Sequence, residues 1–329
     1  MRILITGGSG FLGQHLARAL LEQGHQVQLL GRDMAPARAL IAIGALPVIA
    51  DLRDRAAVIA ACADVDAIYH VGALSVPWGR RADFFAINVD GTAAVLAGCR
   101  RHNVQRVIYV SSPSVVFDGR DHRDLSEAAP YPRRFASVYS LTKKLGEDLV
   151  NAADWCERVI VRPKAIFGPG DRSLLPRMIA VARQGRLPQI GDGRNLVDLT
   201  YVENVADALV LALDAQAANG KTYMITNDEH IALWDVIRLV LRRLGIATDL
   251  RRVPLAAALA AAGLMEFRAM LTGREPLLTR YSAAILGRTQ TYDISAARRD
   301  LGYAPRISVA AGIERTLAGL HRVTGDGKF

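Results

Sequence analysis

A tyrosine and a lysine lie four residues apart in the segment Tyr139-Ser140-Leu141-Thr142-Lys143. Residues four apart lie on one face of a helix, so a helix here would present a phenol and an ammonium group together. A free tyrosine has a pKa of about 10, and a nearby cation favours its ionised form. We therefore expect Lys143 to lower the pKa of Tyr139. The pair could then exchange a proton with a carbonyl group near neutral pH, provided that a cofactor moves the hydride.

The elements that must position such a cofactor stand at the start of the chain. Residues 3–5 form an apolar run that is typical of a buried parallel strand, and residues 14–21 have helical spacing. A glycine-rich loop between a strand and a helix brings backbone N–H groups close to a pyrophosphate. Gly8, Gly10 and Gly13 match G-x-G-x-x-G, and Gly7, Gly10 and Gly13 match a second spacing that begins at Thr6. The loop residues that we expect to bind the cofactor are Gly7, Gly10, Phe11, Leu12 and Gly13.

The end of the next predicted strand, over residues 26–30, selects the cofactor. An NAD site has a carboxylate about 20 residues beyond the glycine loop, whereas an NADP site favours an arginine. Here Gly31 stands where the carboxylate is expected, and Arg32 can form a bidentate pair with a phosphate. This pattern predicts NADP(H). NAD(H) stays open because a small backbone shift would let Asp33 hold the ribose.

Composition limits the class of protein. The chain has 329 residues, of which 51% are hydrophobic, enough for a large core or for one large domain with a smaller one. Its three cysteines (Cys62, Cys99 and Cys156) suit small buried residues in a reducing cytoplasm, without a disulfide framework or a metal site. No signal peptide is expected before the first strand. The net charge of +9 comes without a basic-aromatic module, so we expect no nucleic-acid partner but some attraction to anionic ligands or acidic membranes.

Strand and helix patterns alternate through the first half of the chain. This alternation predicts an α/β fold with a Rossmann-type, doubly wound parallel sheet. We expect residues 1–167 to form the dinucleotide-binding domain, with residues 203–226 returning to it, and residues 168–202 and 227–329 to form an interleaved substrate-binding lid. The predicted strands cover residues 26–30, 47–50, 67–70, 106–110, 159–162 and 222–225, and the predicted helices residues 35–43, 54–61, 83–101, 138–153 and 205–213.

Residues 255–271 form an unusually apolar segment. A membrane-spanning helix needs about 20 apolar residues. Glu266 and Arg268 interrupt this segment too early, so we do not expect it to span a membrane. Two interpretations remain: an apolar helix buried in the lid, which we prefer, or an apolar wall for a long acyl or sterol chain that also touches a membrane surface.

The glycine loop, Tyr139 and Lys143 together resemble those of an extended short-chain dehydrogenase/reductase. The segments 73–79 and 112–117 are most similar to the 3β-hydroxysteroid dehydrogenase branch, which includes sterol-4-carboxylate 3-dehydrogenases. Within that branch, the pattern resembles the bacterial 2-alkyl-3-oxoalkanoate reductases of olefin biosynthesis best. Other segments that match the family over nearly the whole chain are residues 88–92, 111–115, 162–163, 168–171, 198–202, 292–295 and 301–303.

This resemblance implies a role for individual residues. Ser112 takes the position of the family's catalytic serine, with Ser114 as the alternative, and Asn88 takes that of the helix-borne asparagine that supports a water relay. Lys143 would also bond the nicotinamide ribose. His70 is expected to make a structural hydrogen bond rather than to act in catalysis. The other residues that we expect along the cofactor are Arg32, Asp51, Leu52, Gly72, Ala73, Pro163 and Ile166.

The resemblance also implies an NADP(H)-dependent oxidoreductase for a β-keto or β-hydroxy acid with hydrophobic arms. A sterol substrate is one alternative, and an NAD-dependent sugar-nucleotide epimerase or dehydratase is another. The sugar-nucleotide relatives continue into Tyr-Gly where this chain has Val116-Phe117. A non-catalytic regulator that senses dinucleotides is the third alternative, and the intact Tyr139–Lys143 pair argues against it. The family also suggests a homodimer through the helices over 83–101 and 138–153. A contact with another enzyme of the pathway stays open.

Overall fold

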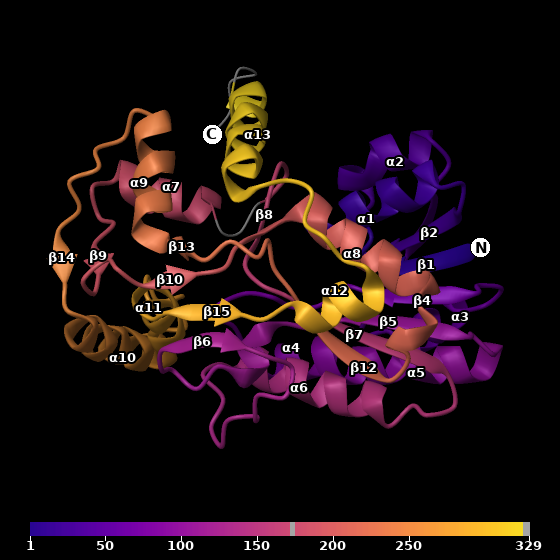
Figure 1. Ribbon diagram of the computed structural model, residues 1–329. Helices are drawn as coiled ribbons and strands as arrows, with labels where there is room; N and C mark the ends of the chain where they lie inside the picture. Colours follow the sequence, from indigo (N-terminus) through magenta and orange to yellow (C-terminus); the bar gives the residue numbers. More distant parts are fainter. Residues whose placement is uncertain (172–174, 325–329) are drawn as a thin grey trace.

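Seven parallel strands form the central sheet of the computed structural model, which describes residues 1–171 and 175–324 (Figure 1). The order across the sheet is β12-β7-β5-β4-β1-β2-β3. Strand β1 therefore lies between β2 and β4, and the chain direction of the connections reverses there, at the position where doubly wound sheets bind ligands. The strands are β1 (Arg2–Thr6), β2 (Gln26–Gly31), β3 (Leu46–Ile49), β4 (Ala67–His70), β5 (Arg106–Val110), β7 (Glu157–Pro163) and β12 (Lys221–Ile225).

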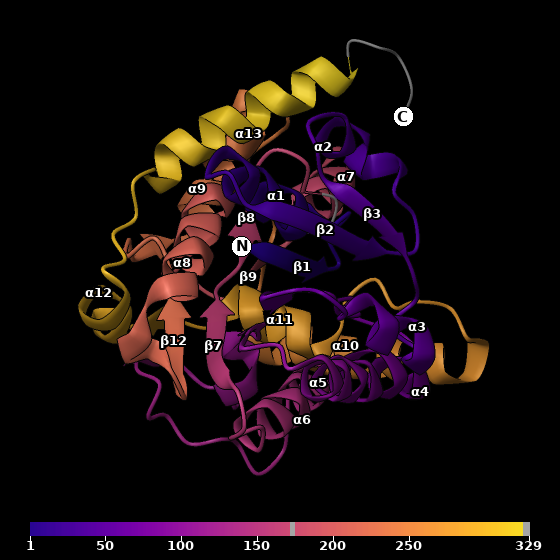
Figure 2. The same ribbon diagram turned by 90° about the vertical axis from the view of Figure 1, so that its right-hand side faces the viewer.

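Helices cover both faces of this sheet, as Figure 2 shows. Ile3 and Ile5 of β1 contribute to the core under α1 and α8, while Leu4 contributes to the core under α3 and α5. Alternate residues of a strand point to opposite faces, so a fully apolar strand is buried on both sides. One face carries α1 (Phe11–Glu22), α2 (Arg38–Ala42) and α8 (Val202–Asp214), and the other carries α3 (Arg55–Ala61), α4 (Arg81–Phe85), α5 (Gly91–His102) and α6 (Val138–Asn151).

The remaining elements build a second region beside the carboxyl edge of the sheet (Figure 1). It contains a four-stranded sheet in the order β13-β10-β15-β6 and two pairs, β11 with β8 and β14 with β9. Its strands are β6 (His122–Leu125), β8 (Ile166–Phe167), β9 (Gln189–Ile190), β10 (Leu196–Val197), β11 (Thr200–Tyr201), β13 (Ile231–Ala232), β14 (Arg252–Val253) and β15 (Gln290–Tyr292). Its helices are α7 (Leu175–Arg183), α9 (Leu233–Arg243), α10 (Leu255–Thr272), α11 (Arg280–Gly287) and α13 (Val309–Thr324), and α12 (Ser295–Leu301) follows β15.

The predicted Rossmann-type fold is confirmed, including the return of residues 221–225 to the main sheet as β12. The helix predicted over 83–101 is interrupted by a π-helical turn at Ala86–Asp90, and the one over 35–43 begins with a 3₁₀ turn at Ala35–Ala37. The three cysteines are free and buried, as expected.

Two segments lie differently from the predicted division into domains. β6, expected in the first domain, pairs with β15, and α12, expected in the lid, packs on α8 and β12. Both depend on contacts with residues more than 70 positions away, which no local pattern reveals. The division itself stays a prediction, and its residues 172–174 and 325–329 lie outside the described residues.

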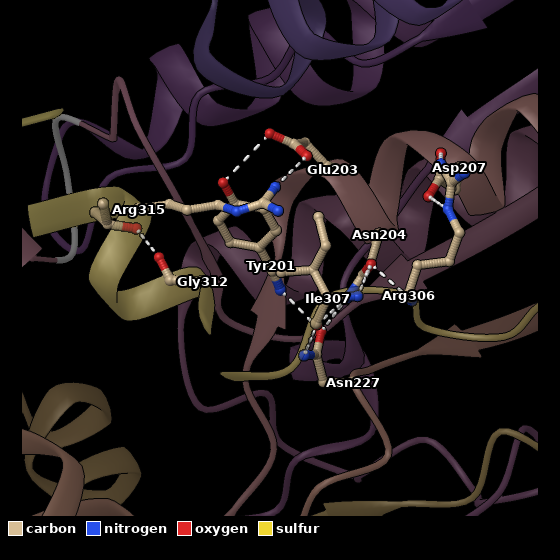
Figure 3. A network of polar contacts seen from close by, with 10 residues as sticks. Tyr201, Glu203, Asn204, Asp207, Asn227, Arg306, Ile307, Gly312 and Arg315 are labelled. Carbon is tan, nitrogen blue, oxygen red and sulfur yellow. Dashed lines mark hydrogen bonds and ion pairs between the residues drawn. The ribbon is translucent and has the colours of Figure 1, made fainter. Parts of the chain in front are cut away.

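A polar network joins the C-terminal segment to the start of α8 (Figure 3). The Asn204 amide donates to Asn227 Oδ1 at 2.8 Å and to the Ile307 carbonyl at 2.7 Å. Its Oδ1 accepts from the backbone N–H groups of Arg306 and Ile307, both at 3.1 Å. Asn204 is fully buried, so both ends of its amide must be satisfied by the protein.

We expect Asn204→Ala to lower the free energy of unfolding by about 2–4 kcal/mol, because buried groups left without partners cost roughly 1–3 kcal/mol each. The control is Arg306→Ala, which removes a pair with Asp207 whose arginine side chain is 72% exposed. An exposed pair contributes less than about 1 kcal/mol. Urea unfolding measures both, and similar losses in the two variants would contradict the role assigned to Asn204.

Helix α10 is mostly exposed, so the preferred interpretation of residues 255–271 as a buried lid helix is wrong. By length and hydropathy alone, two helical segments among the described residues could cross a membrane, Arg81–His102 and Leu255–Thr272. Half of the apolar stretch in Arg81–His102 is buried inside the protein, against 17% of the apolar stretch in Leu255–Thr272. The composition of α10 could not reveal this, because the side that packs and the side that faces solvent are both apolar.

Candidate active site

The glycine loop joins β1 to α1 at the carboxyl edge of the sheet. Gly7 has a φ of +68°, and a Cβ atom on it would lie 2.7 Å from the Cα atom of Gly72. A Cβ atom on Gly13 would lie 2.2 Å from the Gly7 carbonyl oxygen. Larger residues at these two positions would therefore force the loop apart. The glycines hold the end of β1, the start of α1 and Gly72, two residues after β4, in close contact.

The first turn of α1 follows directly on this loop. Gly10 is the N-cap of α1 and provides no capping side chain. The N–H groups of Phe11 and Leu12 consequently have no acceptor within the helix. Unpaired N–H groups at the positive end of a helix dipole bind anions. The residues present thus fit the pyrophosphate of a dinucleotide.

A directed chain of hydrogen bonds holds the end of β4 beside this loop. The Thr92 hydroxyl donates to the Asn88 carbonyl at 2.7 Å, so it must accept from His70 Nε2, 2.9 Å away. His70 Nδ1 then accepts from the Thr6 hydroxyl at 2.7 Å, and Thr6 Oγ1 accepts from the Gly72 N–H at 3.1 Å. Burial, followed by the charge of Lys143, lowers the pKa of His70 to about 3. His70 is therefore neutral and structural, as expected.

Asn88 lies in the π-helical turn and forms hydrogen bonds with two other segments of the chain. Its Oδ1 accepts from the Leu74 N–H at 2.7 Å, and its Nδ2 donates to the Leu74 carbonyl at 3.2 Å and to Thr142 Oγ1 at 3.0 Å. It thereby ties the loop after β4 to α6. These contacts make Asn88 a positioning residue, whereas the expected water relay has no support in them. π-helical turns occur frequently at functional sites.

Tyr139 stands in the first turn of α6. This helix begins at Val138 because the Ser137 hydroxyl caps it by accepting from the Ser140 N–H at 3.1 Å. The Tyr139 phenol interacts with the hydroxyl groups of Ser75 and Ser112. Burial raises the pKa of Tyr139 above its usual value, and these two serines act in the opposite direction.

Lys143 lies one turn further along α6. Its side chain is buried, and Nζ lies 4.0 Å from the centre of the Tyr109 ring, a cation–π geometry. Burial lowers the pKa of Lys143 to about 7, while the Glu147 carboxylate opposes this shift. The pKa of the Tyr139 phenol is raised. This is contrary to the expectation from spacing, which was that Lys143 would lower it. Spacing shows which groups are neighbours, whereas burial, which here decides the shift, depends on the surrounding elements.

Glu147 is held by a buried ion pair. Arg162 of β7 binds its carboxylate through two bonds of 2.7 Å, and the Tyr131 hydroxyl donates to it at 2.7 Å. Because Glu147 is already neutralised by Arg162, it compensates only part of the cost of burying Lys143. The lysine is therefore a poorly stabilised cation in a low-dielectric site.

Ser112 follows β5 as the N-cap of a short 3₁₀ helix, Pro113–Val116, and accepts from the Ser114 N–H at 3.2 Å. This places Ser112 beside Tyr139, as the resemblance implies. The Ser114 hydroxyl is buried and interacts with a tyrosine side chain. Its neighbour is Tyr281 of α11, whose pKa is raised by burial and by Tyr139.

Sequence reasoning therefore missed two groups near the Tyr139 phenol, Ser75 and Tyr281. Ser75 lies within the matched segment 73–79, which could have indicated it. Tyr281 is separated from Tyr139 by 142 positions, and no spacing connects the two.

The end of β2 lies next to the glycine loop. A Cβ atom on Gly31 would lie 2.8 Å from Ser9 Oγ, so a side chain at residue 31 would point at the loop. Arg32 is exposed. The Asp33 carboxylate accepts a hydrogen bond from the Ala35 N–H at 2.8 Å, so one of its oxygen atoms is already used within its own turn.

The other predicted cofactor residues also lie along the carboxyl edge. Asp51 binds Arg53 at 2.6 Å, and this bond lowers the pKa of Asp51 to about 2. Leu52 packs against Gly72, and Ala73 is the next residue after Gly72. Pro163 ends β7 and Ile166 begins β8. The structure thus brings all of the predicted residues to one edge, while their roles in binding stay predictions.

An open hollow of about 530 Å³ lies beside α6, lined by Arg81, Arg133, Phe135, Ser137, Val138 and Leu141. Leu141 is two positions from Tyr139, so the two side chains point to opposite sides of the helix. This hollow therefore belongs to the outer side of α6 and not to the side that carries the Tyr139 phenol.

Known proteins resemble this chain over nearly its whole length. The sequence model of the 3-beta hydroxysteroid dehydrogenase/isomerase family matches residues 4–255. The 2-alkyl-3-oxoalkanoate reductase of Stenotrophomonas maltophilia (strain K279a) is 38% identical, covering 97% of this chain and 99% of the relative. The decarboxylating sterol-4-alpha-carboxylate 3-dehydrogenase of Mus musculus is 32% identical, with 98% and 91% covered. The structure of UDP-glucuronic acid 4-epimerase from Bacillus cereus in complex with NAD has a TM-score of 0.77 at 23% identity, covering 98% of this chain and 99% of that chain.

Proposed function

Because the chain belongs to the 3-beta hydroxysteroid dehydrogenase/isomerase family, we propose that it reduces the keto group of a 2-alkyl-3-oxoalkanoate with NADPH. Family membership makes it an NAD(P)-dependent oxidoreductase of the extended short-chain type that acts on CH–OH groups. The observation that carries the proposal is the phenol of Tyr139 beside Ser112, at the sheet edge where the glycine loop also lies.

The residues of the site divide the work of a ketone reduction. The bound nicotinamide would supply the hydride. The raised pKa of Tyr139 keeps its phenol protonated near neutral pH, so it can donate that proton to the carbonyl oxygen. Ser112 would hold the same oxygen by a hydrogen bond. Lys143, when charged, would stabilise the phenolate that remains after the transfer.

Three features of the β2 end support a preference for NADPH. Gly31 leaves space next to the glycine loop where an NAD site has a carboxylate. Asp33, the acid of this turn, already accepts a hydrogen bond from the Ala35 N–H. Arg32 is exposed and lies close enough to Asp51 to affect the pKa of that carboxyl group. It therefore lies near another of the predicted cofactor residues.

We expect Arg32→Ala to lower kcat/KM for NADPH by roughly tenfold or more, because a charge-assisted bidentate pair with the 2′-phosphate is lost. The value for NADH should change by less than about threefold, since NADH lacks that phosphate. Initial rates with both cofactors measure the effect. Arg18→Ala, on the exposed side of α1, is the control. Equal losses with NADPH and NADH would contradict the assigned phosphate contact.

The substrate class rests on the relatives. A 2-alkyl-3-oxoalkanoate reductase matches this chain end to end, and a sterol-4-alpha-carboxylate 3-dehydrogenase does so at lower identity. Both substrate names describe an oxygenated carbon near a carboxylate on a large hydrophobic molecule. The sterol acid is therefore the second candidate, and the sugar-nucleotide epimerases share only the fold.

A substrate panel distinguishes these candidates. Purified protein is tested in three separate assays. The first contains NADPH and a 2-alkyl-3-oxo acid, the second NAD(P)⁺ and a sterol acid, and the third NAD(P)⁺ and a UDP-sugar. We expect oxidation of NADPH only with the 3-oxo acid. Conversion of the UDP-sugar without net change in the cofactor would overturn the proposal. The cytoplasmic location and the homodimer through helices α5 and α6 remain predictions.

A further inference from the structure

The C-terminal half of helix α10 turns its large apolar side chains to solvent, whereas Leu255 and Leu259 in its first turns pack against the protein. The fully buried residues of α10 are three alanines, Ala258, Ala262 and Ala269. A surface helix of a globular protein ordinarily does the reverse, with its large apolar residues toward the core. The large exposed side chains, which we call the α10 apolar face, are Leu264 (70% exposed), Phe267 (60%), Met270 (72%) and Leu271 (73%), with Leu277 (78%) just beyond the helix.

The α10 apolar face forms one continuous stripe. Leu264, Phe267 and Leu271 are spaced by three and four residues, which places them on one side of the helix. Exposed large apolar residues that are scattered singly need no explanation, but a contiguous group of them marks an interaction surface.

The helix cannot turn this face inward without losing its own packing. The alanine side lies against α11, with which α10 makes its main contacts. Glu266, in the middle of α10, accepts from the Arg280 N–H at 2.7 Å and lies 3.6 Å from its guanidinium group. Small residues allow close approach of the two helices, and larger ones at those positions would push them apart. The observed orientation is therefore set by packing, and the apolar face has no partner among residues 1–171 and 175–324.

The charges around this face are positive. Arg268 and Arg274 are exposed, and neither has an ion-pair partner within residues 1–171 and 175–324. The two acids of the same stretch are both engaged, Glu266 with Arg280 and Glu275 with Arg177. Arg251 and Arg252, before the helix, are also exposed, with Asp249 as the one neighbouring acid in the sequence.

We propose that the α10 apolar face docks on the surface of an anionic lipid bilayer. A helix with apolar side chains on one side and unpaired arginines around them lies in the membrane interface and is attracted by acidic headgroups. Because the alanine side stays packed on α11, and the Glu266–Arg280 pair stands in the middle of the helix, α10 lies along the membrane and does not cross it. The exposed arginines select a bilayer as the partner, since a second copy of this basic chain would meet them with like charge.

This docking would place the lid near the lipid phase. α11, which packs on α10, also carries Tyr281, the neighbour of Tyr139 and Ser114. At the far end of the molecule, β1, β2 and α2 lie away from α10 (Figure 1). A hydrophobic substrate could then enter from the lipid side while the cofactor region remains in water. The docking itself does not depend on the proposed function, because it is argued from the surface of the lid alone.

Binding of the full-length protein to vesicles tests the proposal. Vesicles of phosphatidylcholine alone are compared with vesicles that also contain phosphatidylglycerol, by co-sedimentation at low and high salt. The apolar variant is Leu264→Gln/Phe267→Gln/Leu271→Gln, and the charge variant is Arg268→Gln/Arg274→Gln. The matched control is Leu46→Gln/Ile49→Gln on β3, whose side chains are 55% and 76% exposed at the opposite end of the molecule. Thermal unfolding checks that the variants are folded.

We expect the native chain and the β3 control to bind the anionic vesicles, and binding to weaken at high salt. The apolar variant should lose binding by at least about tenfold, and the charge variant should lose the preference for phosphatidylglycerol. Failure of the native chain to bind either vesicle would overturn the proposal, as would unchanged binding of the apolar variant. Analytical ultracentrifugation adds a third contrary outcome: if the apolar variant converts a dimer to monomers, a second copy covers this face.

Discussion

Tyr139→Phe is expected to lower kcat for ketone reduction by roughly 10²–10⁴-fold, the range typical of losing a general acid. The phenylalanine ring keeps the shape of the side chain but removes the hydroxyl that interacts with Ser75 and Ser112. NADPH binding should change by less than about twofold, because the glycine loop is built from other elements. Steady-state rates with a 3-oxo acid and titration of NADPH fluorescence measure the two effects separately.

A second tyrosine provides the control. Tyr303 is buried, and its hydroxyl donates to the Thr226 carbonyl at 2.9 Å, away from the glycine loop. Tyr303→Phe removes the same atom and should cost stability without a comparable loss of kcat. If Tyr139→Phe retained more than about a tenth of the native turnover, Tyr139 would not be the general acid.

Lys143→Met is expected to lower kcat by roughly 10–10³-fold, because the cation that stabilises the phenolate after proton transfer is removed. Lys144→Met is the matched control, since Lys144 points outward and pairs with Asp148 at 2.6 Å. We expect that control to retain turnover within about threefold. Equal activity of the Lys143 and Lys144 variants would exclude a role for Lys143 in the chemistry.

Lys143→Met is expected to lower kcat but to raise the stability of the folded protein, and the gain in stability depends on pH. Burial lowers the pKa of Lys143 in the folded protein from 10.5 to about 7. Between these values the unfolded chain binds a proton that the folded chain does not, so the native protein gains stability as the pH rises. The cost of burying the charge is fully present below pH 7. Lys143→Met has no such proton and removes the cost.

We therefore expect the Met variant to be at least as stable as the native protein at a pH of about 6, with the difference shrinking toward a pH of about 10. Urea unfolding at several pH values measures this difference. A variant that is less stable than the native protein at low pH, by an amount independent of pH, would show that Lys143 is not a buried cation with a lowered pKa.

Local sequence was sufficient for the two parts of the site that depend on local geometry. The glycine loop was predictable because a strand, a turn and a helix follow one another within 22 residues, and only glycine fits the close approach at residues 7 and 13. The Tyr139–Lys143 pair was predictable because helical spacing alone brings residues four apart to one face. Ser112 was placed by the family resemblance, which sets the serine just after a strand.

The role of Asn88 and the hydrogen-bond partners of His70 needed the fold. Asn88 ties together Leu74 and Thr142, 14 positions before it and 54 after it, and nothing in the sequence joins these contacts. The direction of the hydrogen bonds through His70 likewise depends on β1, β4 and the π-helical turn meeting at one edge. Such contacts are made by elements that are distant in the chain, and patterns of spacing carry no information about them.

By itself, the sequence determined that this chain has a Rossmann-type sheet with a dinucleotide loop, and which phenol and ammonium group stand together on a helix. Periodicity and turn chemistry are local, so they survive whatever the rest of the chain does. Only the tertiary structure decided the protonation of that pair, because burial by surrounding elements raises the pKa of Tyr139 and lowers that of Lys143. It also decided which side of α10 meets solvent, since an alanine stripe and a stripe of larger apolar residues can be told apart only by seeing which one packs on α11.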